Sequence, residues 1–132
     1  MLGSNGLDTM ASRLLIVDDN AQFLGAAKDL LERQGVDVIA VASTAAEAIG
    51  ITHELRPDCV LVDVDLGADN GFDLAVRLAA DGACPVVLIS AYSETDFADL
   101  IAASPAVGFI SKADLSAQRI ADVLGRGRPL PS

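Results

Sequence analysis

Positive charge is scarce in this chain of 132 residues, in which nine Lys and Arg oppose nineteen Asp and Glu. The formal net charge is therefore −10 at pH 7. A surface of this sign repels phosphate backbones and anionic lipids over most of its area, which argues against direct binding of nucleic acid or of a membrane. The excess of acidic residues needs another explanation.

Soft metal ligands are equally few, because the chain has only Cys59, Cys84 and His53. A zinc site needs about four such ligands at close spacing, so this class of site is excluded. We interpret the cysteines as reduced thiols in the core, and His53 as a solvated surface residue. No apolar run approaches the roughly 20 residues of a membrane-spanning helix, and residues 1–11 do not resemble a signal peptide. A cytoplasmic location is expected.

Apolar residues make up 52% of the chain, which excludes disorder for most of it. The length suits one domain. We expect a disordered leader over residues 1–11, a folded domain over 12–125, and a tail or linker stub over 126–132, where glycine, proline and arginine gather.

Five short apolar runs alternate with helix-like patterns, and they lie at residues 14–17, 36–42, 59–62, 86–89 and 107–110. Runs without polar alternation indicate strands that are covered on both faces, as in a parallel sheet. The alternation predicts an α/β fold, a (βα)5 three-layer sandwich with right-handed crossovers. In the flavodoxin-like strand order 2-1-3-4-5, the first, third and fourth strands lie side by side.

Polar side chains follow four of these runs. They are Asp18 and Asp19 after the first run, Asp63 and then Asp65 after the third, Ser90 after the fourth and Lys112 after the fifth. Each is commonplace alone, since an Asp pair before a helix is often only a cap. Together they would meet at the carboxyl edge of the sheet, where open α/β folds bind ligands.

Converging carboxylates are costly, because two unit charges about 4 Å apart repel by roughly 4 kcal/mol at an effective dielectric of 20. Something positive must lie among them. Mg²⁺ prefers oxygen ligands and typically takes one or two carboxylates while keeping several waters. The sequence therefore predicts a Mg²⁺ site here, with Lys112 as a further positive charge.

These residues resemble the response regulator receiver domains of two-component signalling, with a single-domain receiver of the chemotaxis-regulator type as the favoured form. The resemblance covers residues 13 to about 125. Its motifs are Leu14-Leu15-Ile16-Val17-Asp18-Asp19-Asn20, Cys59-Val60-Leu61-Val62-Asp63, Asn70-Gly71, Ser90-Ala91 and Phe109-Ile110-Ser111-Lys112.

The resemblance implies that Asp63 is the phosphoacceptor, which takes a phosphoryl group from a sensor histidine kinase or a histidine phosphotransfer protein. It also implies that Asp19, Asp63 and the backbone carbonyl of Asp65 hold Mg²⁺, while Asp18 acts mainly through a bound water. Lys112 would contact a phosphoryl oxygen. Such a domain is a signalling module, with at most self-catalysed phosphorylation and dephosphorylation, and not an enzyme.

The resemblance further implies a switch. Ser90 would bond another phosphoryl oxygen, and its movement would let Phe109 turn inward. The face formed by the fourth helix, the fifth strand and the fifth helix would then change shape for a downstream protein partner or an output domain.

Four positions depart from the family pattern. Ala113 replaces a proline usually joined by a cis bond, and because a cis bond before a non-proline residue costs about 3 to 4 kcal/mol, we expect a trans bond or a reshaped loop. Gly67 replaces another common proline and should loosen its loop. Asp65 adds negative charge near the incoming phosphate, which would slow phosphorylation or bias turnover by water. Phe109 lacks the hydroxyl of the commoner tyrosine.

Two other functions stay open at this point. A degenerate receiver would act as a protein-interaction module without phosphorylation, which Ala113 and Asp65 keep in view. A metal-dependent catalytic pair at Asp63 and Asp65 is disfavoured, because aspartyl-nucleophile phosphatases carry their Asp pair on the first strand, and the topoisomerase-type site needs an early glutamate. Tyr92 could line the site entrance or merely cover the next helix.

Overall fold

Five parallel strands form the central sheet of the protein, of which the computed structural model describes residues 13–82 and 84–126. The predicted leader and all but the first residue of the predicted tail lie outside these residues. The strands are β1 (Arg13–Val17), β2 (Asp37–Ala42), β3 (Cys59–Asp63), β6 (Val86–Ser90) and β7 (Gly108–Ser111). Their order is β2-β1-β3-β6-β7, which is 2-1-3-4-5 when these five are counted along the chain. The predicted fold class and strand order are confirmed.

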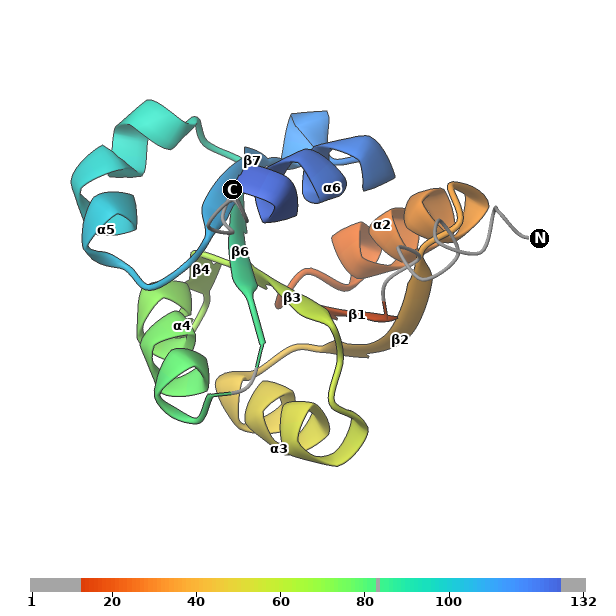
Figure 1. The fold of residues 1–132 in the computed structure, drawn as a ribbon, viewed down its shortest axis with the longest axis horizontal. Coiled ribbons are helices and arrows are strands. Elements are labelled where there is room, and N and C mark those ends of the chain that lie inside the picture. The colour runs from red at the N-terminus through yellow and green to blue at the C-terminus, as the bar shows by residue number, and fades with distance from the viewer. Residues whose placement is uncertain (1–12, 83, 127–132) are drawn as a thin grey trace, which may run out of the picture.

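Helices cover both faces of this sheet (Figure 1). Helices α2 (Ala21–Arg33) and α6 (Ala117–Arg126) pack on one face. The other face carries α3 (Ala45–Leu55), α4 (Gly71–Ala80) and the short α5 (Ala98–Ala103). Successive strand residues alternate between two buried clusters, since Leu14 belongs to the first and Leu15 to the second. Burial on both faces explains why the apolar runs have no polar alternation.

The strand boundaries place the polar residues at the sheet edge. Strands β3 and β6 each run one residue further than predicted, so that Asp63 and Ser90 are the last residues of their strands. Helix α2 ends at Arg33, two residues before Gly35, which has φ +93°. Helix α6 reaches Arg126, so the first residue of the predicted tail is helical.

Two features near this edge differ from what the sequence predicts. An antiparallel hairpin is formed by β4 (Asp65–Leu66) and β5 (Asp69–Asn70). The predicted fourth helix is instead the 3-10 turn η1 (Glu94–Phe97) followed by α5, which has only six residues and none that is buried. Ile101 packs against the core but is only partly buried, so α5 has little of the burial that supplies most helical stability.

The loop after β7 follows its expectation. No cis peptide bond occurs in the described residues, so Lys112 and Ala113 are joined in trans. The 3-10 turn η2 (Lys112–Asp114) continues directly from the strand. Among the described residues, no helix is long and apolar enough to cross a membrane.

Candidate functional site

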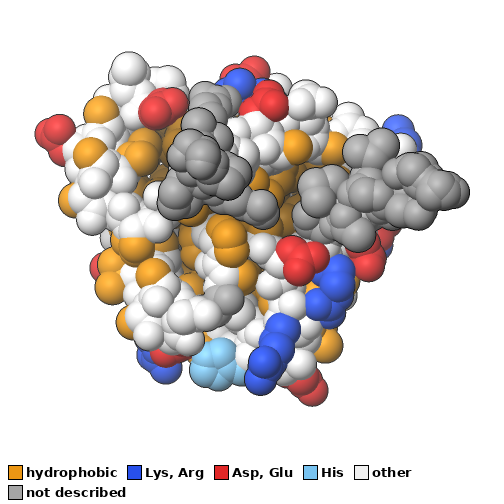
Figure 2. Space-filling view, in the orientation of Figure 1, with side chains coloured by type: hydrophobic (Ala, Val, Ile, Leu, Met, Phe, Trp, Pro, Cys, Tyr) orange, Lys and Arg blue, Asp and Glu red, His pale blue; other side chains and the backbone are white. Residues whose placement is uncertain are grey.

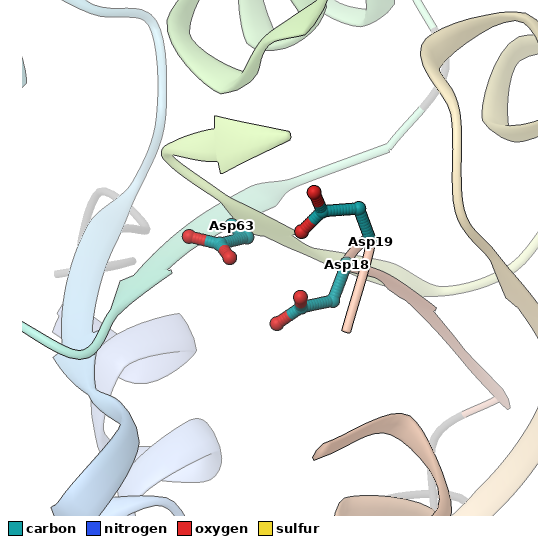
Figure 3. Close-up of side chains that lie close together, drawn as sticks. All are labelled: Asp18, Asp19 and Asp63. Atoms are coloured by element: carbon teal, nitrogen blue, oxygen red, sulfur yellow. The ribbon is translucent and has the colours of Figure 1, made fainter. Parts of the chain in front are cut away.

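Three carboxylates converge at the carboxyl edge of the sheet, as the strand order predicts. Asp18 and Asp19 follow β1 and Asp63 ends β3, and one oxygen from each lies within 4.8 Å of the other two (Figure 3). Asp18 is 0% exposed and Asp63 is 6% exposed, whereas Asp19 faces solvent. Two of the three charges are therefore withdrawn from water.

The ammonium of Lys112 lies between the two buried carboxylates. Its Nζ is 2.6 Å from Asp18 Oδ2 and 3.1 Å from Asp63 Oδ2. One ammonium against three carboxylates leaves two negative charges uncompensated when all four groups are ionised. Hard oxygen donors with this residual charge fit a divalent cation such as Mg²⁺.

Burial and pairing act together on the ionisation of the site. Burial raises the pKa of Asp63, and repulsion from Asp18 adds to it, while the amide of Asp65 and the ammonium of Lys112 oppose the shift without reversing it. Burial alone would lower the pKa of Lys112, but its pairs with Asp18 and Asp63 outweigh burial and raise that pKa. Lys112 therefore stays charged throughout the neutral pH range.

Backbone amides fix the direction of the two buried carboxylates. Asp18 Oδ1 accepts a hydrogen bond of 2.9 Å from the amide of Asn20, and Asp63 Oδ1 accepts one of 3.1 Å from the amide of Asp65. Each bond reaches two residues along the chain, a local turn that aspartate forms readily. Both side chains therefore hold one oxygen at their own loop and turn the other toward Lys112.

The unpredicted hairpin packs against the exposed carboxylate. Gly67 has φ +72°, and a Cβ at this position would lie 2.7 Å from Asp19 Oδ2. Asp69 Oδ2 accepts a hydrogen bond of 2.9 Å from the amide of Ala45 at the start of α3, which ties the hairpin to the fold. Gly67 thus allows a close approach to Asp19, a role that the sequence did not indicate.

The Asn70-Gly71 motif has a steric explanation in the structure. Asn70 caps α4, since its Oδ1 accepts hydrogen bonds from the amides of Phe72 at 2.7 Å and Asp73 at 3.2 Å. A Cβ on Gly71 would lie 2.1 Å from the backbone oxygen of Asp63, so no side chain fits there. The motif brings α4 directly against the backbone of the central acid.

Ser90 and Phe109 come from the neighbouring strands β6 and β7. Ser90 is 1% exposed, and its Oγ accepts a hydrogen bond of 3.0 Å from the amide of Tyr92. Phe109 is buried, with its ring centroid 6.5 Å from that of Phe97. The ring predicted to turn inward already lies inward in this structure.

An open cavity of about 700 Å³ joins the acidic residues to an apolar wall. Its lining includes every predicted site residue except Phe109, namely Asp18, Asp19, Asp63, Asp65, Ser90 and Lys112. The apolar wall includes Phe72, Tyr92, Phe97 and Leu100, so Tyr92, which is largely exposed, lines the site. His53 does not line it and instead contacts Asp81 at 3.1 Å on the surface, in agreement with its prediction.

One contact at the site was not anticipated. The ring centroid of Phe23 lies 4.3 Å from Lys112 Nζ. The sequence shows Phe23 only as one apolar residue at helical spacing in α2, which is the pattern of a core residue. An aromatic residue in the first turn of the helix that follows the acidic pair was the available signal.

The chain matches the family model of the response regulator receiver domain over residues 14–124. It is 38% identical over 89 residues to the DNA-binding response regulator MtrA of Mycobacterium tuberculosis, a match that covers 67% of this chain and 39% of MtrA. It is 26% identical over 100 residues to the transcriptional regulatory protein PdtaR of the same species, covering 76% of this chain and 49% of PdtaR. The matched region spans less than half the length of these curated relatives.

Solved structures show the same similarity. A LuxR family two-component response regulator from Aurantimonas sp. SI85-9A1 superposes with a TM-score of 0.76 at 29% identity, covering 87% of this chain and 86% of that chain. The signal receiver domain of the putative response regulator NarL from Mycobacterium tuberculosis gives 0.75 at 25% identity, covering 88% and 95% respectively.

Proposed function

The chain belongs to the response regulator receiver domain family, and from this premise we propose that Asp63 accepts a phosphoryl group from a sensor histidine kinase or a histidine phosphotransfer protein. The observation that carries the proposal is the convergence of Asp18, Asp19 and Asp63 around the ammonium of Lys112. Receiver domains are signalling domains, and the proposed reaction transfers one group to the protein itself.

The transfer is a substitution at phosphorus. A carboxylate oxygen of Asp63 forms the new O–P bond as the P–N bond to the donor histidine breaks, and the imidazole leaves with the electron pair of that bond. The product is an acyl phosphate on Asp63. The lining position of Asp63 in the open cavity supports this step, because it gives the donor an approach from solvent.

Mg²⁺ fits the donor set, and we assign Asp19, Asp63 and the backbone carbonyl of Asp65 as its protein ligands. Asp18 would act through a bound water, as the family pattern implies, and its side chain is 0% exposed. When bound, Mg²⁺ would neutralise part of the negative charge on the transferring phosphoryl group. The two uncompensated carboxylate charges favour its binding.

Lys112 and Ser90 supply the remaining contacts to the phosphoryl group. As negative charge moves from Asp63 to the phosphoryl oxygens, the ammonium of Lys112 can follow it within the cavity. Ser90 Oγ accepts the amide hydrogen of Tyr92, which leaves the hydroxyl hydrogen free to donate.

The response would be a change of packing on the face formed by α5, β7 and α6. Because Phe109 is already buried against Phe97, the switch would alter which groups its ring contacts and would need no inward turn. A pull on Ser90 would move the loop after β6, which carries Tyr92 and leads to Phe97. A downstream protein partner or an output domain would read the altered face.

The direct test is incubation with acetyl phosphate and Mg²⁺, followed by intact mass measurement. We expect a gain of one phosphate that disappears in Asp63→Asn. Asp37→Asn is the control, since it changes an exposed acid that does not line the cavity and should retain the gain. Absence of any gain with acetyl phosphate and phosphoramidate would overturn the proposal and favour a phosphorylation-independent interaction module.

Thermal unfolding tests the metal site separately. Because Mg²⁺ should bind only the folded state, millimolar Mg²⁺ should raise the melting temperature relative to EDTA, with a stabilisation that follows RT ln(1 + [L]/Kd). Asp19→Asn should reduce this effect. Asp37→Asn, an exposed acid at the opposite end of the sheet, should leave it unchanged.

A further inference from the structure

The ammonium of Lys112 has an aromatic neighbour as well as two carboxylates. Its Nζ lies 4.3 Å from the ring centroid of Phe23, within the distance at which a cation is attracted to the face of a ring. The Lys112 side chain is 17% exposed, so water can solvate only part of the ammonium. The ring of Phe23 is therefore a third partner of the ammonium, beside Asp18 and Asp63.

The position of Phe23 is itself fixed by the acidic loop. Asn20 donates its amide hydrogen to Asp18 Oδ1 at 2.9 Å, and Asn20 Oδ1 accepts the amide hydrogen of Phe23 at 3.1 Å. The ring of Phe23 then meets Lys112, whose Nζ returns to Asp18 Oδ2 at 2.6 Å. These four contacts form a closed loop of interactions that links Asp18, Asn20, Phe23 and Lys112.

We propose that Phe23 is a positioning residue, whose ring face holds the ammonium of Lys112 beside the phosphoacceptor Asp63. The effect on phosphoryl transfer rests on the proposed function. The physical reason is the freedom of the lysine stem, whose four carbons would otherwise let the ammonium swing toward solvent or settle on Asp18 alone.

A ring face suits this task because it attracts a cation without taking one of its hydrogen bonds in a fixed direction. The ammonium can therefore move from Asp63 to a phosphoryl oxygen while keeping its contact with Phe23. A third carboxylate at this place would instead compete with the phosphoryl group for the same N–H donors.

Two substitutions distinguish an effect of the ring face of Phe23 from an effect of side-chain packing alone. Phe23→Leu keeps an apolar side chain against the core but removes the ring, and we expect it to slow phosphorylation by acetyl phosphate about fivefold. Phe23→Tyr retains the ring and should restore a rate near that of the wild type. Both rates are measured by intact mass at saturating Mg²⁺.

Nuclear magnetic resonance tests the contact without any phosphorylation. The chain has only two lysines, Lys28 and Lys112, so a lysine-labelled sample gives two ε-methylene signals, and Lys28→Arg assigns them. The Lys112 signal should show an upfield ring-current shift and an Overhauser contact with the ring protons of Phe23. The shift should vanish in Phe23→Leu and persist in Phe23→Tyr. Phe72→Leu, an aromatic residue elsewhere on the cavity wall, should not move the signal.

The outcomes are distinct from those that test the proposed function. Absence of the Overhauser contact in the wild type, or an unchanged Lys112 signal in Phe23→Leu, overturns the positioning role. Equal slowing by Phe23→Leu and Phe23→Tyr also overturns it, since packing would then explain the effect. If Phe23→Leu does not fold, the wild-type Overhauser contact and the phosphorylation rate of Phe23→Tyr decide whether Phe23 positions Lys112.

A wild-type protein that takes no phosphate refutes the proposed function. The lysine spectrum still decides where the ammonium of Lys112 is held.

Discussion

The two sides of the cavity differ in how firmly the fold holds them. At the ends of β1 and β3, Asp18 and Asp63 are buried and joined through Lys112. After β6, by contrast, Tyr92 is 65% exposed and Leu100 is 54% exposed, and α5 has no buried residue. Figure 2 shows exposed apolar side chains on this α5 side of the molecule. We call the first region the acidic side and the second, residues 91–103, the α5 side.

The two sides therefore suit different tasks: the acidic side suits phosphoryl transfer, and the α5 side suits a conformational change. Reacting groups need fixed positions, and the acidic side supplies them through buried strands, amide bonds and an ion pair. Segments with few buried contacts open or rearrange at low free energy, which suits the α5 side to a change of shape. The proposed signal would pass from the firmly held side to the loosely held one through Ser90.

The largest expected contrast comes from the same substitution made on each side. Leu61→Ala removes a fully buried side chain two residues before Asp63, and should lower the free energy of unfolding by about 4 kcal/mol. Leu100→Ala should change it by less than about 0.5 kcal/mol, because this side chain is half exposed. Urea denaturation measures both. Similar losses in the two variants would erase the proposed difference between the sides.

The two lysines provide the next comparison. Without Mg²⁺, Lys112→Ala should lower the free energy of unfolding at pH 7 by about 3 kcal/mol, since Asp18 and Asp63 lose the cation between them. Lys28→Ala removes an exposed ion pair with Glu32 on α2 and should cost about 0.5 kcal/mol. Saturating Mg²⁺ should recover part of the Lys112→Ala loss. A Lys112→Ala loss no greater than that of Lys28→Ala would show that the pair adds little to the acidic side.

Two glycines with positive φ test the contact between the hairpin and Asp19. Gly35→Ala should cost about 1 kcal/mol for its backbone conformation alone, because no atom of the described residues lies within 4 Å of the added carbon. Gly67→Ala carries the same strain and also displaces Asp19 Oδ2, so it should cost about 2 kcal/mol and weaken the Mg²⁺ effect on melting. If Gly67→Ala leaves the Mg²⁺ effect intact, the hairpin does not constrain the proposed Mg²⁺ ligand Asp19.

The smallest expected effect is a dependence of stability on pH that comes from Asp63. Because its pKa is raised by burial, the folded protein holds this proton more tightly than the unfolded chain does. Protonated Asp63 therefore stabilises the folded state at low pH. This stabilisation is lost as the pH rises from about 4 through the raised pKa of Asp63. Lys112 adds no slope in this range, since its raised pKa lies above it.

Urea denaturation in EDTA at a series of pH values from 4 to 8 measures this effect. Asp63→Asn should gain stability relative to the wild type as the pH rises, whereas the exposed control Asp37→Asn should show no such gain. A constant difference between Asp63→Asn and the wild type across the series would mean that burial does not raise the pKa of Asp63.

The sheet and the acidic side could be predicted from the sequence, because both depend on the pattern of apolar runs. Strands buried on both faces leave uninterrupted apolar runs, and in a parallel sheet the residues that follow such runs share one edge. The placement of Asp18, Asp63 and Lys112 at this edge therefore follows from the positions of the apolar runs in the sequence. Their order in space needed only the strand order 2-1-3-4-5.

The features that were missed depend on contacts between distant parts of the chain. The hairpin at Asp65–Asn70 has two-residue strands, too short for any periodicity; it lies close to Asp19 and is hydrogen-bonded to the start of α3. The α5 segment has a helical pattern but little to pack against, so it is short. Phe23 has the spacing of a core residue, and only the fold brings Lys112 to its ring.

The central claim is that Asp63, among several neighbouring acids, carries the phosphoryl group. After reaction with acetyl phosphate and Mg²⁺, borohydride reduces an aspartyl phosphate to homoserine, which tandem mass spectrometry locates in the sequence. We predict homoserine at position 63 alone, and none without Mg²⁺. Homoserine at position 18, 19 or 65, or at no position in a protein that has gained phosphate, would contradict this account.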